Sequence, residues 1–120
     1  MANPNIVNVT TIQGKVTGLD LTTTGQNVVI NPSGSGKIFK INNLTISNID
    51  GTNNCDVYVN VYKNQSTPYY LASTVTVPAD ASLIVISKDT SIYLEENDSL
   101  RCWATATGDL QAVCSYEEIS

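Results

Sequence analysis

The sequence predicts an all-β protein, an antiparallel β-sandwich of jelly-roll type with about eight or nine strands. Hydrophobic residues recur at every second position in several short stretches, as in strands that bury one face. Clusters of Gly, Pro, Asn, Asp and Ser separate these stretches, as chain reversals require. No stretch of useful length shows the periodicity of an amphipathic helix.

Length and composition favour one folded domain. The chain has 120 residues, of which 42% are hydrophobic and 14% charged, unlike a disordered chain. We expect residues 14–120 to form the sandwich and residues 1–13 to be either its first strand or an extended arm. The net charge of −5 disfavours nucleic acid, and no apolar run is long enough to span a membrane. Residues 1–13 lack the features of a secretion signal, so synthesis in a cytoplasm is expected.

The first half of the chain contains four predicted strands. A short strand carries Leu19 and Leu21, and another spans Gln26–Ile30. Residues 37–63 contain two more, joined by the turn 50–54, and we expect them to pair as a hairpin. In the first of these two, the hydrophobic alternation slips by one residue at Asn42-Asn43, which predicts a β-bulge.

The next predicted strands are shorter or less regular. Tyr69–Val77 alternates and is closed by Pro78. Ser82–Ser87 is apolar on both faces, which predicts a central strand covered on both sides. A short strand follows at Ser91–Leu94, and the turn after it places Asn97 where a positive φ is needed.

The last two strands allow a prediction of register. Each has one hydrophobic face, formed by Leu100, Cys102, Ala104 and Ala106 and by Leu110, Ala112, Cys114 and Tyr116. A hairpin through the loop 107–109 would set Cys102 opposite Cys114 and Trp103 beside Val113. The two cysteines would then be near enough for a disulfide, or would stay reduced as small hydrophobic residues in a reducing compartment.

Residues for common catalytic and metal sites are missing or badly spaced. The absence of histidine removes Ser-His-Asp and Cys-His pairs, and the three cysteines have no C-x-x-C spacing. The loop before Lys37 does not match a P-loop. Glu95, Glu96 and Asp98 lie in one turn, so they are expected to be solvated, or to bind Ca²⁺ weakly, rather than to flank a substrate as glycosidase carboxylates do. The sequence therefore predicts no enzymatic activity, cofactor or metal.

Aromatic and aliphatic side chains on otherwise polar faces remain as interface candidates. Trp and Tyr are common anchors of protein interfaces, and they also stack on sugar rings. The alternative is that the face with Trp103 is the inner layer of a second sheet. Together with the apolar residues of the arm, the interface candidates are Ile6, Val7, Val9, Tyr58, Tyr62, Trp103 and Val113.

Three stretches show a resemblance to a known group of proteins. They are KIFKINNLTISNIDGTNNCDVYVNVYK, VPADASLIVISKDTSIYLEENDSLRCWA and LQAVCSYEEIS. These stretches resemble small virion structural proteins of tailed bacteriophages, particularly phages of marine cyanobacteria. The resemblance covers most of the chain from Lys37 onward. Where those proteins carry Gly, this chain has Asn97, which also tolerates a positive φ.

The resemblance implies a non-enzymatic β-sandwich that assembles on a virion. The first expectation is a capsid decoration, or cement, protein on the outer capsid surface, made in the host cytoplasm. It would bridge subunits of the major capsid protein and form a homo-oligomer, with a trimer favoured. The alternatives are a neck or tail accessory protein, or a glycan-binding module on a virion appendage. Glycan binding predicts an aromatic pair that lines a groove, whereas decoration predicts aromatic residues buried between subunits.

Overall fold

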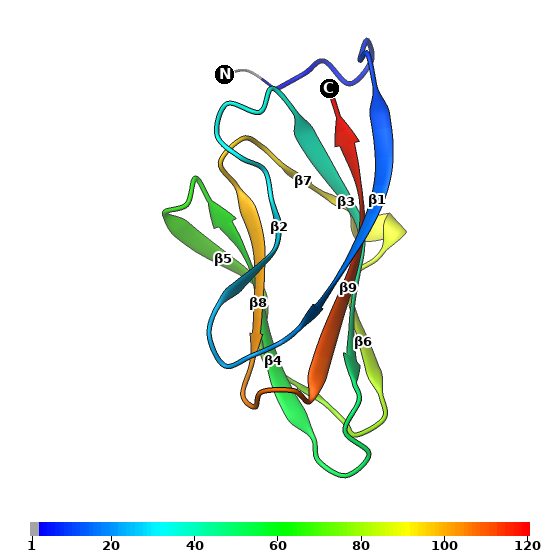
Figure 1. Cartoon of the computed structure of the whole chain (residues 1–120), viewed down its shortest axis with the longest axis vertical. Helices are drawn as coiled ribbons and strands as arrows, with labels where there is room; N and C mark the ends of the chain where they lie inside the picture. The colour runs from blue at the N-terminus through cyan, green and yellow to red at the C-terminus, as the bar shows by residue number, and fades with distance from the viewer. Residues whose placement is uncertain (1–2) are drawn as a thin grey trace.

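The computed structural model describes residues 3–120, which form two antiparallel sheets packed face to face (Figure 1). Sheet A contains, in order, β1 (Ile12–Asp20), β9 (Leu110–Ile119), β3 (Ile38–Asn48) and β6 (Ser82–Ile86), and the short β7 (Ile92–Leu94) also pairs with β3. Sheet B contains β2 (Gln26–Ile30), β8 (Ser99–Ala104), β4 (Cys55–Lys63) and β5 (Thr67–Val77). A 3₁₀ turn, η1 (Lys88–Thr90), precedes β7. The predicted antiparallel β-sandwich is confirmed.

Neighbouring strands in each sheet come from distant parts of the chain. β9 lies between β1 and β3, and β8 lies between β2 and β4. β4 and β5 form a hairpin within sheet B, and β6 and β7 both pair with β3 in sheet A. The other connections, β1 to β2, β2 to β3, β3 to β4, β5 to β6, β7 to β8 and β8 to β9, cross between the sheets. Most of the backbone pairing in both sheets therefore joins residues that are far apart in sequence.

The inner faces of both sheets fill one hydrophobic core. The largest fully buried apolar side chains are Leu21, Ile41, Leu44, Ile46, Ile86, Leu94, Leu100 and Leu110. Full burial of one such side chain contributes roughly 1.5–3 kcal/mol to folding. The faces that the sequence assigned to the last two strands are confirmed, because Leu100, Cys102 and Ala104 of β8 and Leu110, Ala112 and Cys114 of β9 are all buried.

Two local predictions are also confirmed. The register between β3 and β9 shifts between Ile41 and Asn43, which is the bulge predicted from the slip in alternation. Because the bulge adds one residue, Ile41 and Leu44 both point into the core. Asn97 has a φ of 70°, as expected for its turn.

The two predicted hairpins, within residues 37–63 and between the last two strands, are both wrong. β3 belongs to sheet A and β4 to sheet B, so residues 49–54 cross from one sheet to the other. Residues 105–109 make the same kind of crossing between β8 and β9. Alternation indicates which face of a strand is buried, but strands of both sheets bury a face against the same core. It therefore does not indicate which strands pair.

The position predicted for β6 is wrong as well. β6 lies at an edge of sheet A rather than at its centre. Ile86 is buried, but Ile84 points to the outer face and is 61% exposed. The apolar residues on both faces of β6 thus reflect one buried face and one exposed aliphatic patch.

Asp98 holds two turns together at one end of the sandwich. Asp98 is 1% exposed, and its carboxylate accepts hydrogen bonds from the backbone N–H groups of Asn64 (2.9 Å) and Glu95 (3.0 Å) and from the ammonium of Lys63 (2.7 Å). It thereby joins the turn after β4 to the turn before β8. The expectation of a solvated acidic turn is wrong for Asp98.

We expect Asp98→Ala to lower the free energy of unfolding by about 2–3 kcal/mol, because two buried backbone N–H groups lose their acceptor. Urea denaturation measures this loss. Glu95→Ala is the matched control, since Glu95 contacts the same Lys63 at 3.3 Å from a side chain that is 54% exposed. Its expected cost is below about 0.5 kcal/mol. Equal losses in the two variants would contradict the assignment.

Candidate interface surfaces

The outer face of sheet B carries an aromatic cluster, formed by Tyr58, Tyr70 and Trp103. Tyr58 and Trp103 are paired across β4 and β8, and their rings stack with centroids 5.1 Å apart and planes 10° apart. Tyr70 of β5 meets Trp103 edge-on, with the centroids 6.0 Å apart. Such contacts are worth about 0.5–1.5 kcal/mol beyond the buried area, so they fix the three rings in place.

Arg101 extends this surface toward Tyr62. The guanidinium carbon of Arg101 lies 4.6 Å from the centre of the Tyr62 ring, within cation–π range. A Cβ on Gly25 would collide with the same guanidinium, so the glycine leaves the room that the arginine occupies. Within residues 3–120, Arg101 has no ion pair with a carboxylate. A partner that brings a carboxylate can therefore pair with it.

Asn60 lies beneath the aromatic surface. It is paired with Arg101 on one side and with Tyr70 on the other, and it is only 2% exposed. Its side-chain oxygen has no hydrogen-bond partner within residues 3–120. A buried acceptor without a donor costs roughly 1–3 kcal/mol, so a contact that brings a donor here gains that much.

The stacking bears on the sugar-binding alternative. A sugar ring stacks on a free aromatic face, but Tyr58 and Trp103 each turn one face onto the other. Neither ring lines the two hollows described below. The cluster is a set of packed rings with a neighbouring arginine, which is the composition of a protein-interface anchor.

Val113 does not lie beside Trp103, so that prediction is wrong. β9 is in sheet A and β8 in sheet B, and the two side chains therefore point outward from opposite sheets. On sheet A, Val113 is paired with Gly18 on β1 and with Thr45 on β3. On the outer face of this sheet, Val113 of β9 and Ile84 of β6 are exposed, as are Ile12 and Val16 of β1.

The N-terminal candidates lie outside the strands. Within the described part, residues 3–11 precede β1 and are joined to the C-terminus, because the N–H groups of Thr10 and Thr11 donate to the carbonyl of Ser120. Val7 is 91% exposed and Ile6 is also exposed, whereas Val9 is half-buried. The side chains of Ile6 and Val7 are therefore available to a partner.

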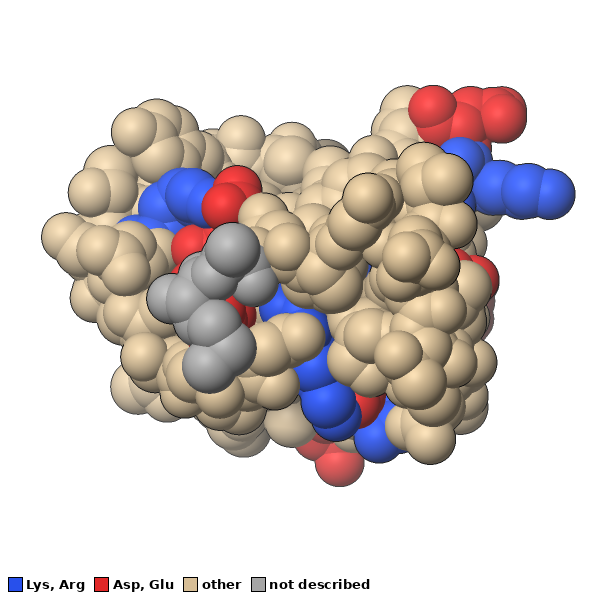
Figure 2. Space-filling view, turned by 90° about the horizontal axis from the view of Figure 1, so that it is seen from above, with Lys and Arg blue, Asp and Glu red and all other residues tan. Residues whose placement is uncertain are grey.

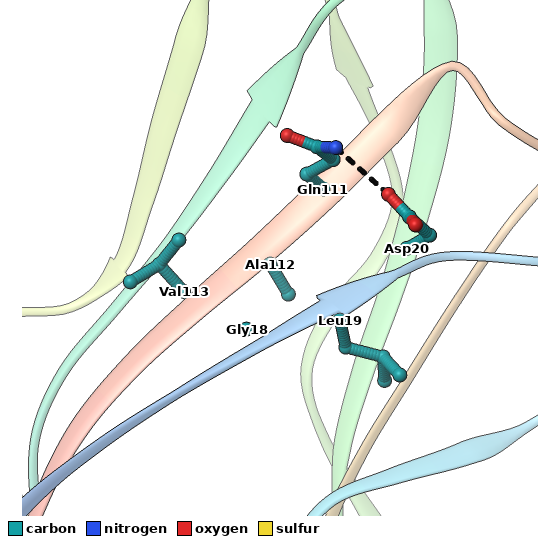
Figure 3. A pocket seen from close by; sticks show the side chains of 6 residues that line it. All are labelled: Gly18, Leu19, Asp20, Gln111, Ala112 and Val113. Carbon is teal, nitrogen blue, oxygen red and sulfur yellow. Dashed lines mark hydrogen bonds between the residues drawn. The ribbon is translucent and has the colours of Figure 1, made fainter.

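A shallow hollow of about 240 Å³ lies between β1 and β9 in sheet A (Figure 3). It is lined by Gly18, Leu19, Asp20, Gln111, Ala112 and Val113. Gln111 donates a hydrogen bond to Asp20 at one end, at 2.8 Å. Because Gly18 has no side chain, the hollow is a gap in the sheet surface that a partner side chain can fill.

A second hollow, of about 370 Å³, opens at the end of the sandwich where the termini lie. Figure 2 views this end, where Lys and Arg side chains lie in the depression between the two sides of the molecule. The carboxylate of Glu118 accepts hydrogen bonds from Lys15 (2.9 Å) and Lys37 (3.0 Å). Burial alone would raise the pKa of Glu118, but the two lysines outweigh it and hold the pKa below its usual value.

The lowered pKa of Glu118 means that its ion pairs stabilise the fold above about pH 4.5 and lose that effect as the pH falls further. We expect Glu118→Gln to lower the free energy of unfolding by about 1 kcal/mol at pH 7. The difference from the wild type should shrink below pH 4.5, as followed by urea denaturation at several pH values. Glu117→Gln, on the neighbouring outward position, is the control. A difference for Glu118→Gln that stays constant with pH would contradict this assignment.

The three cysteines are free and buried. Cys102 and Cys114 lie in different sheets, so the predicted cross-strand pairing is wrong and the reduced alternative is the one the structure shows. Burial raises the pKa of Cys102 to about 12, with a smaller contribution from Cys114, and burial likewise raises the pKa of Cys114 to about 12. Both thiols therefore stay protonated and poorly reactive at neutral pH.

Residues 3–120 contain no group of three or more His, Cys, Asp or Glu residues that is arranged to hold a metal ion. No helix in this part of the chain is both long and apolar enough to cross a membrane.

No protein-family model matches the chain, and no curated protein matches it. Several solved structures are similar to this chain. A chain of the Bacillus endospore appendages, which form disulfide-linked pili, is 14% identical, covers 100% of this chain and 96% of its own length, and has a TM-score of 0.56. A chain from the capsid structure of Helicobacter pylori bacteriophage KHP30 is 10% identical, with 94% and 90% covered and a TM-score of 0.51.

A pentameric capsid protein from metagenomic phage sequences is also similar, at 14% identity. The match covers 83% of this chain and 60% of that protein, with a TM-score of 0.43, which is too distant to support an argument. At these identities the comparisons show the fold. It is a β-sandwich that structural proteins of a phage capsid and of a bacterial appendage also have.

Proposed function

We propose that this chain is a non-enzymatic structural protein of a phage virion, and that it decorates the capsid. In this role it binds the outer surface of the head as a homo-oligomer and bridges subunits of the major capsid protein. The observation that carries the proposal is the fold shared with the KHP30 capsid chain over 94% of the present chain. The resemblance of three sequence stretches to virion proteins of tailed phages, particularly phages of marine cyanobacteria, supports the same role.

The strand order supports it too. The orders β1-β9-β3-β6 and β2-β8-β4-β5 interleave the two ends of the chain, and we class this arrangement as a jelly roll, a fold used by viral capsid domains. Fold alone does not determine function, so the surfaces have to carry the rest of the argument.

A bridging protein needs contact surfaces on more than one side. Sheet B offers the aromatic cluster with Arg101, sheet A offers exposed aliphatic side chains, and the arm offers Ile6 and Val7. The aromatic cluster is the strongest of these, because its rings are already ordered and lose little side-chain entropy on binding. Arg101, which has no carboxylate partner within residues 3–120, and the buried acceptor of Asn60 add polar groups that a partner can contact.

A fibre subunit is the second candidate, favoured by the likeness to the endospore appendage chain over 100% of the present chain. Those pili are disulfide-linked, whereas the three cysteines here are buried in the core. A fibre of this chain would therefore depend on non-covalent contacts. A neck or tail accessory role uses the same surfaces. For glycan binding, the aromatic pair that lines a hollow is Phe39 and Tyr116, whose ring centroids are 5.7 Å apart. Phe39 is only 5% exposed, which leaves little of its ring for a sugar to stack on.

Labelling of intact virions tests the proposed location. We expect gold-conjugated antibody against this protein to decorate the head at regular lattice positions in electron micrographs. The control is the same antibody after absorption with purified protein. Label confined to the neck or tail, or lying along a fibre, would overturn the decoration role.

Binding to purified heads tests the surface. We expect Trp103→Ala to weaken co-sedimentation with heads about tenfold or more, because it removes the centre of the aromatic cluster. Tyr93→Ala is the matched control, since Tyr93 is an exposed tyrosine on β7 of sheet A. Equal effects of the two substitutions, with both variants folded by circular dichroism, would show that the cluster is not the contact surface.

A further inference from the structure

The edges of the two sheets are protected to different extents. In sheet B, β2 has five residues and a register shift, and β5 has two register shifts against β4 together with Pro68 near its start. In sheet A, β6 and β7 have only five and three residues. Short strands, bulges and proline are the usual features that keep an edge from pairing with another chain.

β1 has none of these features. It runs for nine residues in unbroken register with β9, without a bulge or a proline, and it pairs with no strand on its other side. The positions from Ile12 to Gly18 that share the outer face carry no charge, and Val16 at their centre is 70% exposed. A long and regular edge whose outer face is uncharged from Ile12 to Gly18 is a template for another strand.

Two glycines in β1 are not explained by the fold of this chain. Gly14 and Gly18 both lie inside the strand, where glycine is unfavourable. A Cβ on Gly14 would meet nothing within 4 Å, and a Cβ on Gly18 would make only an ordinary contact with the carbonyl of Ala112, at 3.8 Å. Neither residue has a positive φ. Glycine inside a strand often marks the close approach of another backbone.

The two glycines lie symmetrically about Val16, two residues away on each side. In an antiparallel pair of β1 strands centred on Val16, each Gly14 would face Gly18 of the other copy, and the two Val16 side chains would face each other. We propose that β1 pairs in this way with β1 of a second copy, around a two-fold axis at Val16.

The side chains of β1 fit a second copy. A two-fold contact needs a surface that is complementary to itself, and the outer face of β1 from Ile12 to Gly18, which carries no charge, meets that condition. In this register Lys15 lies opposite Thr17 of the other copy, so no like charges are directly opposed. The ammonium of Lys15 is also held by Glu118, at 2.9 Å, on the side of β1 away from the new strand.

The hollow at Gly18 adds a shape argument (Figure 3). Gly18 would face Gly14 of the second copy, whose neighbours on the same face are Ile12 and Val16. These two side chains lie diagonally across from Gly18, close enough to cover the hollow of about 240 Å³. Each copy thus covers the gap that the other leaves, and the two A sheets join into one continuous sheet.

Cross-linking of the full chain tests the register. Cα atoms of directly paired antiparallel residues lie about 4.5–5.5 Å apart, within disulfide range. We expect Val16→Cys to form a covalent dimer on mild oxidation with copper phenanthroline, seen on non-reducing gels. Ile84→Cys is the matched control, because Ile84 is an exposed aliphatic residue at the opposite edge of sheet A. The native cysteines are buried and add no background.

Mass measurement tests the association itself. Light scattering coupled to gel filtration should give a dimer for the wild type and for Ile84→Lys. Val16→Lys should weaken the dimer about tenfold or more, because it sets two like charges directly opposite each other. A wild-type monomer or trimer, or equal cross-linking of Val16→Cys and Ile84→Cys, would overturn the proposal. Location on the virion is a separate measurement, so failure of the decoration role would leave this result standing.

Discussion

The structure depends on the placement of the last two strands at the centres of both sheets. Within residues 3–120, β9 is the only strand that links β1 to the rest of sheet A, and β8 is the only strand that links β2 to the rest of sheet B. Their inward side chains, Leu100, Cys102, Ala104, Leu110, Ala112 and Cys114, fill the middle of the core. Such non-local pairing is expected to make folding slow compared with helical proteins of the same size.

Much of the architecture follows from the sequence, because burial on one face leaves a period of two in every long strand. That signal predicted the sandwich, the bulge at Asn42-Asn43 and the buried faces of β8 and β9. The alternation did not predict which strands pair, because strands of both sheets bury one face against the same core. A short polar loop can join two strands of one sheet as a hairpin or connect a strand of one sheet to a strand of the other. The misplacement of Val113 and of the cysteine pair followed from that failure.

The candidate surfaces were only partly predictable for a related reason. Tyr58, Tyr62 and Trp103 stand out by residue type, but Tyr70 and Arg101 join them only through the pairing of β4 with β5 and β8. The orphaned oxygen of Asn60 has no signal in the sequence at all, because its burial depends on its neighbours. The Gly14 and Gly18 spacing is visible in the sequence, yet its meaning needs the knowledge that β1 is an edge strand.

Uneven protection of the edges limits the kinds of assembly that strand addition can build. An open-ended filament needs two compatible edges on every subunit, one for each direction of growth. Within residues 3–120, β1 is the one long edge without a bulge or a proline. When that edge is used in a two-fold contact, no other long and regular edge remains within residues 3–120. Polymerisation by strand addition therefore ends at two copies. A lattice or shell built from such pairs has to be extended by side-chain contacts on the sheet faces.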